Sequence, residues 1–125
     1  MIPDTRRSPR VPLSAKMRVR VNPTMKETIQ LAKEVVEVKV VDISALGVGV
    51  LSPTFLPQGV LVDLETSRIP LAAEGRPVKG EMHITGKVVY AKPQGSGCRI
   101  GISFTQMEEV DRLLIEQFIA RYPSG

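Results

Sequence analysis

The feature that most constrains the fold is the alternation of apolar and polar residues in short runs. In "KMRVRV" (16–21), Met17, Val19 and Val21 alternate with lysine and arginine, so one face is apolar and the other is charged. A period of two is typical of a half-buried β-strand. Several short strands favour a small antiparallel barrel, because closure of the sheet leaves no exposed edge. Further strand-like runs occur at 35–43, 48–52, 59–65, 81–92 and 98–104.

The period changes near the end of the chain, in "TQMEEVDRLLIEQFIARY" (105–122). Thr105 and Glu108 have the spacing of a capping box, which predicts a helix over 105–122. Asp111 falls among the polar positions of this helix. The apolar residues recur at helical spacing and predict a buried stripe made of Met107, Val110, Leu113, Leu114, Ile115 and Phe118.

Two further segments flank the first strand. Residues 1–12 are expected to form a flexible arm, because Pro9 and Pro12 disfavour helix at the residues before them. Residues 24–34 are expected to hold a short inserted helix, since Thr24 and Glu27 have capping-box spacing; a continued strand or hairpin arm is the alternative. The remainder, 13–125, is read as a single domain whose last strands are joined by a turn at 93–97.

The composition excludes several classes of protein. No apolar run approaches the roughly 20 residues of a membrane span, and the N-terminus lacks the apolar region of a signal peptide. A soluble, cytoplasmic protein without membrane insertion is therefore expected. With only His83 and Cys98, and without a P-loop, the sequence predicts no catalytic triad, metal site or cofactor, and so no enzyme.

The positive charge is concentrated at the N-terminus. Residues 1–20 hold six basic residues and one acidic residue, so they carry +5, while the rest of the chain carries −1. Arg6, Arg7 and Arg10 therefore predict a local anion site. With two Tyr, three Phe and no Trp, the chain has few residues on which bases can stack, so DNA or RNA is not expected as a partner. Arg76 and Arg99 are taken as surface charges, although a strand arginine near the barrel rim is able to reach a ligand.

A second polar motif, "DISALG" (42–47), contains Asp42, Ser44 and Gly47. On a strand, Asp42 and Ser44 would project from the same face. Asp42 offers only acceptors, Ser44 offers a donor and acceptors, and Gly47 permits a positive φ and a close approach of backbone to ligand. This set suits the N–H donors of a purine, or the positioning of an arginine. A role of Ser44 in capping a turn is compatible with it.

Taken together, the two motifs resemble the ligand signature of the PilZ domain family, in which RxxxR is followed by DxSxxG. "GKVVYAK", "CRIGISF" and "EEVDRLLIEQFI" resemble the late hairpin and closing helix of that family. The resemblance implies an all-β fold with a C-terminal helix: a six-stranded antiparallel PilZ-type β-barrel. It also implies binding of the bacterial second messenger cyclic di-GMP (c-di-GMP) by Arg6, Arg7, Arg10, Asp42, Ser44 and Gly47.

The implied function is that of a non-catalytic receptor. Binding of c-di-GMP would order the N-terminal arm, change a surface for a downstream protein partner, and so act in motility or biofilm control. The alternative is a PilZ-like protein–protein adaptor that binds no nucleotide. The identity of the partner, the ligand stoichiometry and the oligomeric state stay open at this stage.

Overall fold

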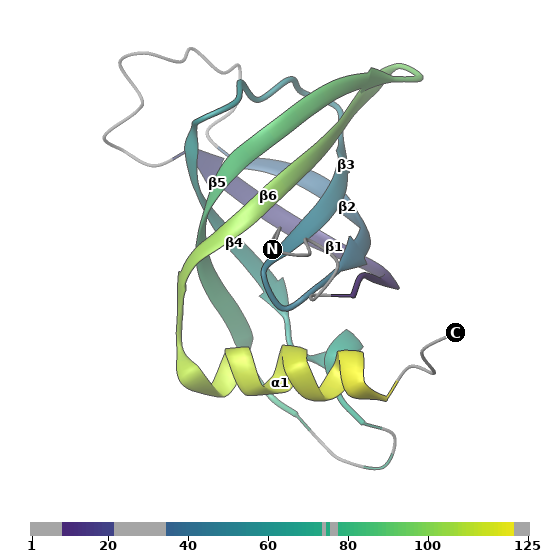
Figure 1. The fold of residues 1–125 in the computed structure, drawn as a ribbon, viewed down its shortest axis with the longest axis vertical. Coiled ribbons are helices and arrows are strands. Elements are labelled where there is room, and N and C mark those ends of the chain that lie inside the picture. Colours follow the sequence, from purple (N-terminus) through teal and green to yellow (C-terminus); the bar gives the residue numbers. More distant parts are fainter. Residues whose placement is uncertain (1–8, 22–34, 74, 76–77, 122–125) are drawn as a thin grey trace, which may run out of the picture.

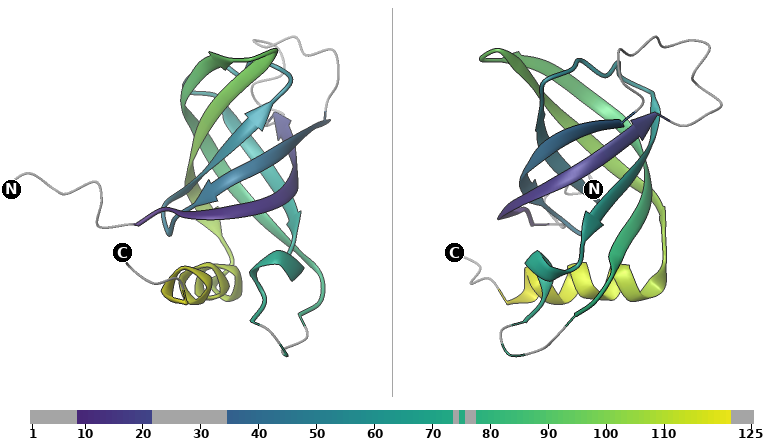
Figure 2. Two further views of the ribbon diagram at one scale, coloured as in Figure 1. Left: turned by 90° about the vertical axis from the view of Figure 1, so that its right-hand side faces the viewer. Right: turned by 180° about the vertical axis from the view of Figure 1, so that it is seen from behind.

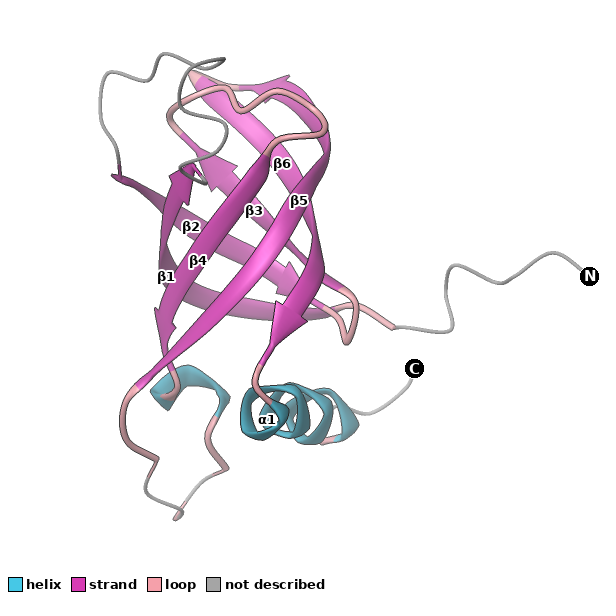
Figure 3. Ribbon diagram, turned by 90° about the vertical axis from the view of Figure 1, so that its left-hand side faces the viewer, coloured by secondary structure: helices cyan, strands magenta, loops and turns pink. Residues whose placement is uncertain are grey.

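Six antiparallel strands close into a barrel, and one helix follows them. The computed structural model describes residues 9–21, 35–73, 75 and 78–121. Around the barrel the strands follow the order β1-β2-β3-β6-β5-β4 (Figures 1 and 3). This architecture confirms the predicted fold class. The elements are β1 (Val11–Val21), β2 (Val35–Ile43), β3 (Gly47–Ser52), β4 (Leu61–Ser67), the 3-10 turn η3 (Ile69–Leu71), β5 (Glu81–Gln94), β6 (Gly97–Met107) and α1 (Glu109–Ala120).

The inside of the barrel is filled by the apolar half of each alternating strand. Met17, Val19 and Val21 of β1 are 2%, 1% and 4% exposed, as the alternation predicts. The pairing register shifts in β1 between Pro12 and Ala15, and in β2 between Val40 and Asp42. Such bulges increase the local twist of a strand. They lie at the end of the β1–β2 pair that carries Asp42.

The strands are longer at several ends than the sequence predicts. β1 begins at Val11, so the last two residues of the predicted arm 1–12 belong to the barrel. The turn between β5 and β6 is reduced to residues 95–96. Residues 1–8 of the predicted arm and the predicted helix at 24–34 lie outside the described residues.

The predicted start of the C-terminal helix at Thr105 is wrong. Gln106 and Met107 remain paired with Thr85 and Ile84 of β5, and the Thr105 hydroxyl donates to the Thr85 carbonyl at 3.0 Å. The helix α1 therefore begins at Glu109, and its N-cap residue makes no side-chain capping bond. Backbone pairing of Gln106 and Met107 with β5 therefore prevails over the local capping-box pattern.

The buried face of α1 also differs from the predicted stripe. Val110 and Leu113 are 54% and 44% exposed, whereas Asp111, Ile115 and Phe118 are buried. These three residues are spaced four and three apart and so share one face of the helix. That face packs at one end of the barrel, where α1 lies beside η3 (Figure 2).

An ion pair with one buried partner links this helix to the barrel. Arg68, which directly precedes η3, donates from Nε to Oδ1 of Asp111 at 2.8 Å, and Asp111 is fully buried. Arg121, at the end of α1, donates from Nη2 to the carbonyl of Leu71 at 2.7 Å. A charged residue can therefore occupy the inner face of α1 because its partner comes from the segment after β4.

Candidate functional site

A hydrogen-bonded ion pair joins the two motifs. Arg10, just before β1, donates from Nη1 to Oδ1 of Asp42 at 2.8 Å, across 32 residues of sequence. The pairing of β1 with β2 places Pro12 opposite Asp42 and so brings Arg10 to it. The side chains of Arg10 and Asp42 are 45% and 19% exposed, so the pair lies at the surface and is accessible. Arg6 and Arg7 lie outside the described residues.

Ser44 does not share a face with Asp42, contrary to the expectation from their spacing. β2 ends at Ile43, and Ser44 is 2% exposed. Its hydroxyl oxygen accepts hydrogen bonds from the backbone N–H groups of Leu46 and Gly47 at 3.2 and 3.1 Å. In this structure Ser44 thus stabilises the β2–β3 turn from within, which is the turn-capping role that the sequence also allowed.

Gly47 is needed for a close approach of backbone to backbone. Its φ is not positive, so that part of the expectation is wrong. A Cβ atom at Gly47 would overlap the carbonyl oxygen of Ile102 in β6. The N–H of Phe104 donates to the carbonyl of Leu46 at 2.8 Å and ties the same turn to β6. The motif therefore fixes the β2–β3 turn, which follows Asp42, against β6.

Asp42 has a second cationic partner, an arginine that the sequence analysis took as a surface charge able to reach a ligand. Arg99 of β6 donates from Nη2 to Oδ2 of Asp42 at 2.9 Å. The pKa of Arg99 is raised above its ordinary value, mainly by a hydrogen bond with the Tyr90 side chain and to a smaller extent by Asp42. The outside of the barrel thus carries a continuous polar network, made of Tyr90, Arg99, Asp42 and Arg10.

Two glycines make room for this polar network. The strand register places Asp42, Gly49, Gly101 and Tyr90 in one row across β2, β3, β6 and β5. A Cβ atom at Gly49 would lie 2.6 Å from Oδ1 of Asp42, and one at Gly101 would overlap the Tyr90 ring. The carboxylate and the ring therefore both lie close against the sheet. The signal in the sequence was a glycine on each of two adjacent strands, but only the register shows that these glycines are neighbours.

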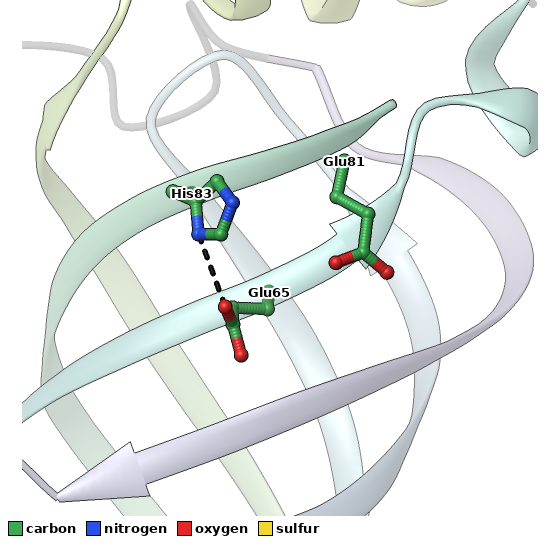
Figure 4. Close-up of side chains that lie close together, drawn as sticks. All are labelled: Glu65, Glu81 and His83. Atoms are coloured by element: carbon green, nitrogen blue, oxygen red, sulfur yellow. Dashed lines mark ion pairs between the residues drawn. The ribbon is translucent and has the colours of Figure 1, made fainter. Parts of the chain in front are cut away.

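A separate cluster on the outer face contains Glu65, Glu81 and His83 (Figure 4). Nδ1 of His83 lies 3.1 Å from Oε2 of Glu65. Arg18 donates from Nη2 to both oxygens of Glu81 at 2.7 Å, and this hydrogen bond lowers the pKa of Glu81. These residue types are able to ligate metals, but the guanidinium of Arg18 already neutralises Glu81. We assign the cluster to the charge pairing between β1, β4 and β5.

The chain matches the PilZ domain family over residues 4–121 and therefore belongs to that family. No curated protein matches it. In the part of the chain that the structure describes, no helix is long and apolar enough to cross a membrane.

Solved structures share the fold. The Bacillus subtilis inhibitor of motility, MotI/DgrA, has a TM-score of 0.70 and 14% identity over 95% of this chain and 51% of its own. The PilZ domain of Escherichia coli YcgR with c-di-GMP has a TM-score of 0.63 and 15% identity, over 94% and 90%. The Klebsiella MrkH complex with c-di-GMP has a TM-score of 0.64 and 20% identity, over 95% and 52%. This chain thus spans about half the length of the MotI and MrkH chains.

Proposed function

We propose that this chain is a non-catalytic receptor for c-di-GMP. The observation that carries the proposal is the Arg10–Asp42 contact of 2.8 Å, because it joins the two halves of the sequence signature at one accessible place. Membership of the PilZ domain family supports it. The c-di-GMP complexes of YcgR and MrkH, which share the fold, support it further.

The chemistry of the site suits a ligand with two phosphates and two guanines. A guanidinium forks onto a phosphate or onto the acceptors of a guanine edge, and it stacks on a purine ring. In the proposal, Arg10 acts in this way together with Arg6 and Arg7 of the N-terminal segment. Asp42 accepts from the N–H donors of a guanine, while Ser44 and Gly47 hold the turn that carries it.

Binding would be relayed by ordering of the N-terminal arm and a change of surface for a protein partner in the cytoplasm. The name of MotI, an inhibitor of motility, suggests motility as one output, and biofilm control is another that we propose from the family resemblance. The adaptor that binds no nucleotide is the alternative outcome of the test below.

Isothermal titration of the purified protein with c-di-GMP tests the proposal, with GTP and cyclic di-AMP as controls. Selective binding of c-di-GMP is expected. Arg10→Ala is expected to weaken it by roughly ten- to a hundredfold, because a charge-assisted hydrogen bond contributes about 1.5–3 kcal/mol. Arg112→Ala is the matched control: Arg112 is 44% exposed and ion-paired like Arg10, but lies on α1.

Unchanged affinity in Arg10→Ala would remove Arg10 from the site. Failure of the folded wild-type protein to bind c-di-GMP would contradict the receptor function. A stable protein partner recovered in a pull-down would then favour the adaptor.

A further inference from the structure

The outer face of the barrel holds a third arginine beside the two motifs. Resting on the proposed c-di-GMP function, we propose that Arg99 binds a phosphate of the dinucleotide and that Tyr90 is its positioning residue. The phosphates would then be held from two sides, by Arg10 and by a cation fixed on the sheet.

Arg99 has donors to spare and access to solvent. A guanidinium has five N–H donors, and within the described residues Arg99 donates from Nη2 to Asp42 and lies beside the Tyr90 side chain, which raises the pKa of Arg99. Its side chain is 31% exposed. The two contacts therefore hold the Arg99 guanidinium in place and leave some of its N–H donors free for an anion.

The neighbours of Arg99 add positive charge. Along the strand pairing, Arg99 lies opposite Lys92 of β5 on one side and Leu51 of β3 on the other, and Leu51 lies opposite Lys39 of β2. Lys92 is placed over the Tyr90 ring, 5.4 Å from its centre. A row of three cations thus crosses the sheet next to Asp42, and their summed potential attracts an anion.

There is also room for a large ligand beside this row. An open hollow of about 500 Å³ lies on the outer face over β1, β2 and β3, with Lys16, Lys39 and Leu51 among its lining residues. Leu51 belongs both to the hollow and to the row that contains Arg99. In the proposal, a cyclic dinucleotide in the hollow lies next to Arg99 across Leu51, on the side of β6 away from Tyr90 on β5.

Positioning explains why Arg99, rather than a lysine of the same row, is the main contact. A side chain that is already held loses less rotamer freedom on binding, so more of its interaction energy is kept. Arg99 is held by Asp42 and lies beside the Tyr90 side chain, whereas Lys39 makes no side-chain hydrogen bond to another described residue. Gly101 contributes by letting the Tyr90 ring lie flat beside Arg99.

The test is titration of c-di-GMP into the full chain carrying Arg99→Gln or Tyr90→Phe, at low and at high salt. Arg99→Gln is expected to lose about tenfold in affinity and part of its salt dependence, because one charge pair is gone. Tyr90→Phe is expected to lose severalfold in affinity but to keep the salt dependence of the wild type. Lys87→Gln is the control: it removes an exposed positive charge that lies on β5, and it is expected to bind like the wild type.

Thermal melts of each variant verify that the barrel is folded. Wild-type affinity in Arg99→Gln, alongside loss in Arg10→Ala, would overturn the role of Arg99 and leave the receptor function standing. Wild-type affinity in Tyr90→Phe would overturn its positioning role. Absence of binding in the wild type would overturn both the inference and the function on which it rests.

Discussion

At the scale of single residues, the central feature is that one carboxylate is shared by two arginines. Arg10 donates to Oδ1 of Asp42 and Arg99 donates to Oδ2. Each carboxylate oxygen has a second lone pair, so in the proposed function a guanine N–H binds Asp42 while both arginines stay in contact with it. The remaining N–H donors of the two guanidinium groups are then available for the phosphates.

The close approach at Gly47 makes a prediction about stability. In Gly47→Ala the new Cβ atom would overlap the Ile102 carbonyl oxygen, and this backbone atom can move only with β6. Overpacking of this kind typically costs about 1–3 kcal/mol. We expect a loss of that size in the free energy of unfolding, measured by urea titration. Leu46→Ala, at a side chain 66% exposed in the same turn, is the control; equal midpoints for both variants would show that the turn yields without strain.

At the scale of elements, the attachment of α1 depends on the Arg68–Asp111 pair. Asp111→Asn removes a fully buried charge and leaves Arg68, whose side chain is 22% exposed, without its anionic partner. Breaking a buried pair from one side costs about 3–5 kcal/mol, and the partial exposure of Arg68 places the expected loss near the lower end. Chemical denaturation followed by helical circular dichroism measures it.

Glu109→Gln is the matched control on the same helix, because Glu109 also pairs with an arginine but at the surface. No measurable change is expected there, since exposed ion pairs contribute little. If Asp111→Asn were as stable as Glu109→Gln, packing of Ile115 and Phe118 alone would account for the position of α1.

At this scale, the sequence predicts an element well when the interactions that form it lie within the element itself. Alternation along one strand predicted β2 with its observed bounds, because burial of every second residue is a property of that strand itself. The start of α1 was missed because pairing of Met107 with Ile84 comes from another strand. The burial of Asp111 was missed for the same reason, since its partner Arg68 is 43 residues away.

The candidate site shows the same limit. The Arg10–Asp42 contact follows from two motifs that the sequence displays. The inward position of Ser44 depends on where β2 ends, and the spacing of Asp42 and Ser44 in the sequence does not show where that is. Arg99 reaches Asp42 only through the register of β2, β3 and β6, so no pattern within "CRIGISF" indicates it.

At the scale of the whole molecule, the site ties together strands from distant parts of the sequence. Arg10 precedes β1, Asp42 lies on β2, Arg99 on β6 and Tyr90 on β5, and these four strands are more than half of the closed barrel. The helix α1 in turn continues directly from β6. A ligand that contacts this polar network is therefore expected to stabilise the barrel and the helix as one cooperative unit.

Hydrogen–deuterium exchange with and without c-di-GMP tests this expectation. At a free ligand concentration 100 times Kd, binding to the folded state adds about 2.7 kcal/mol to its stability. Amides that exchange only by global unfolding gain all of it, so slow amides of β2 and of α1 should be protected to the same degree. The buried contacts of Asp111, Ile115 and Phe118 are the reason to expect α1 to follow the barrel. Protection of β2 with unchanged exchange in α1 would show instead that the helix opens on its own, and that the ion pair with Arg68 does not couple it to the site.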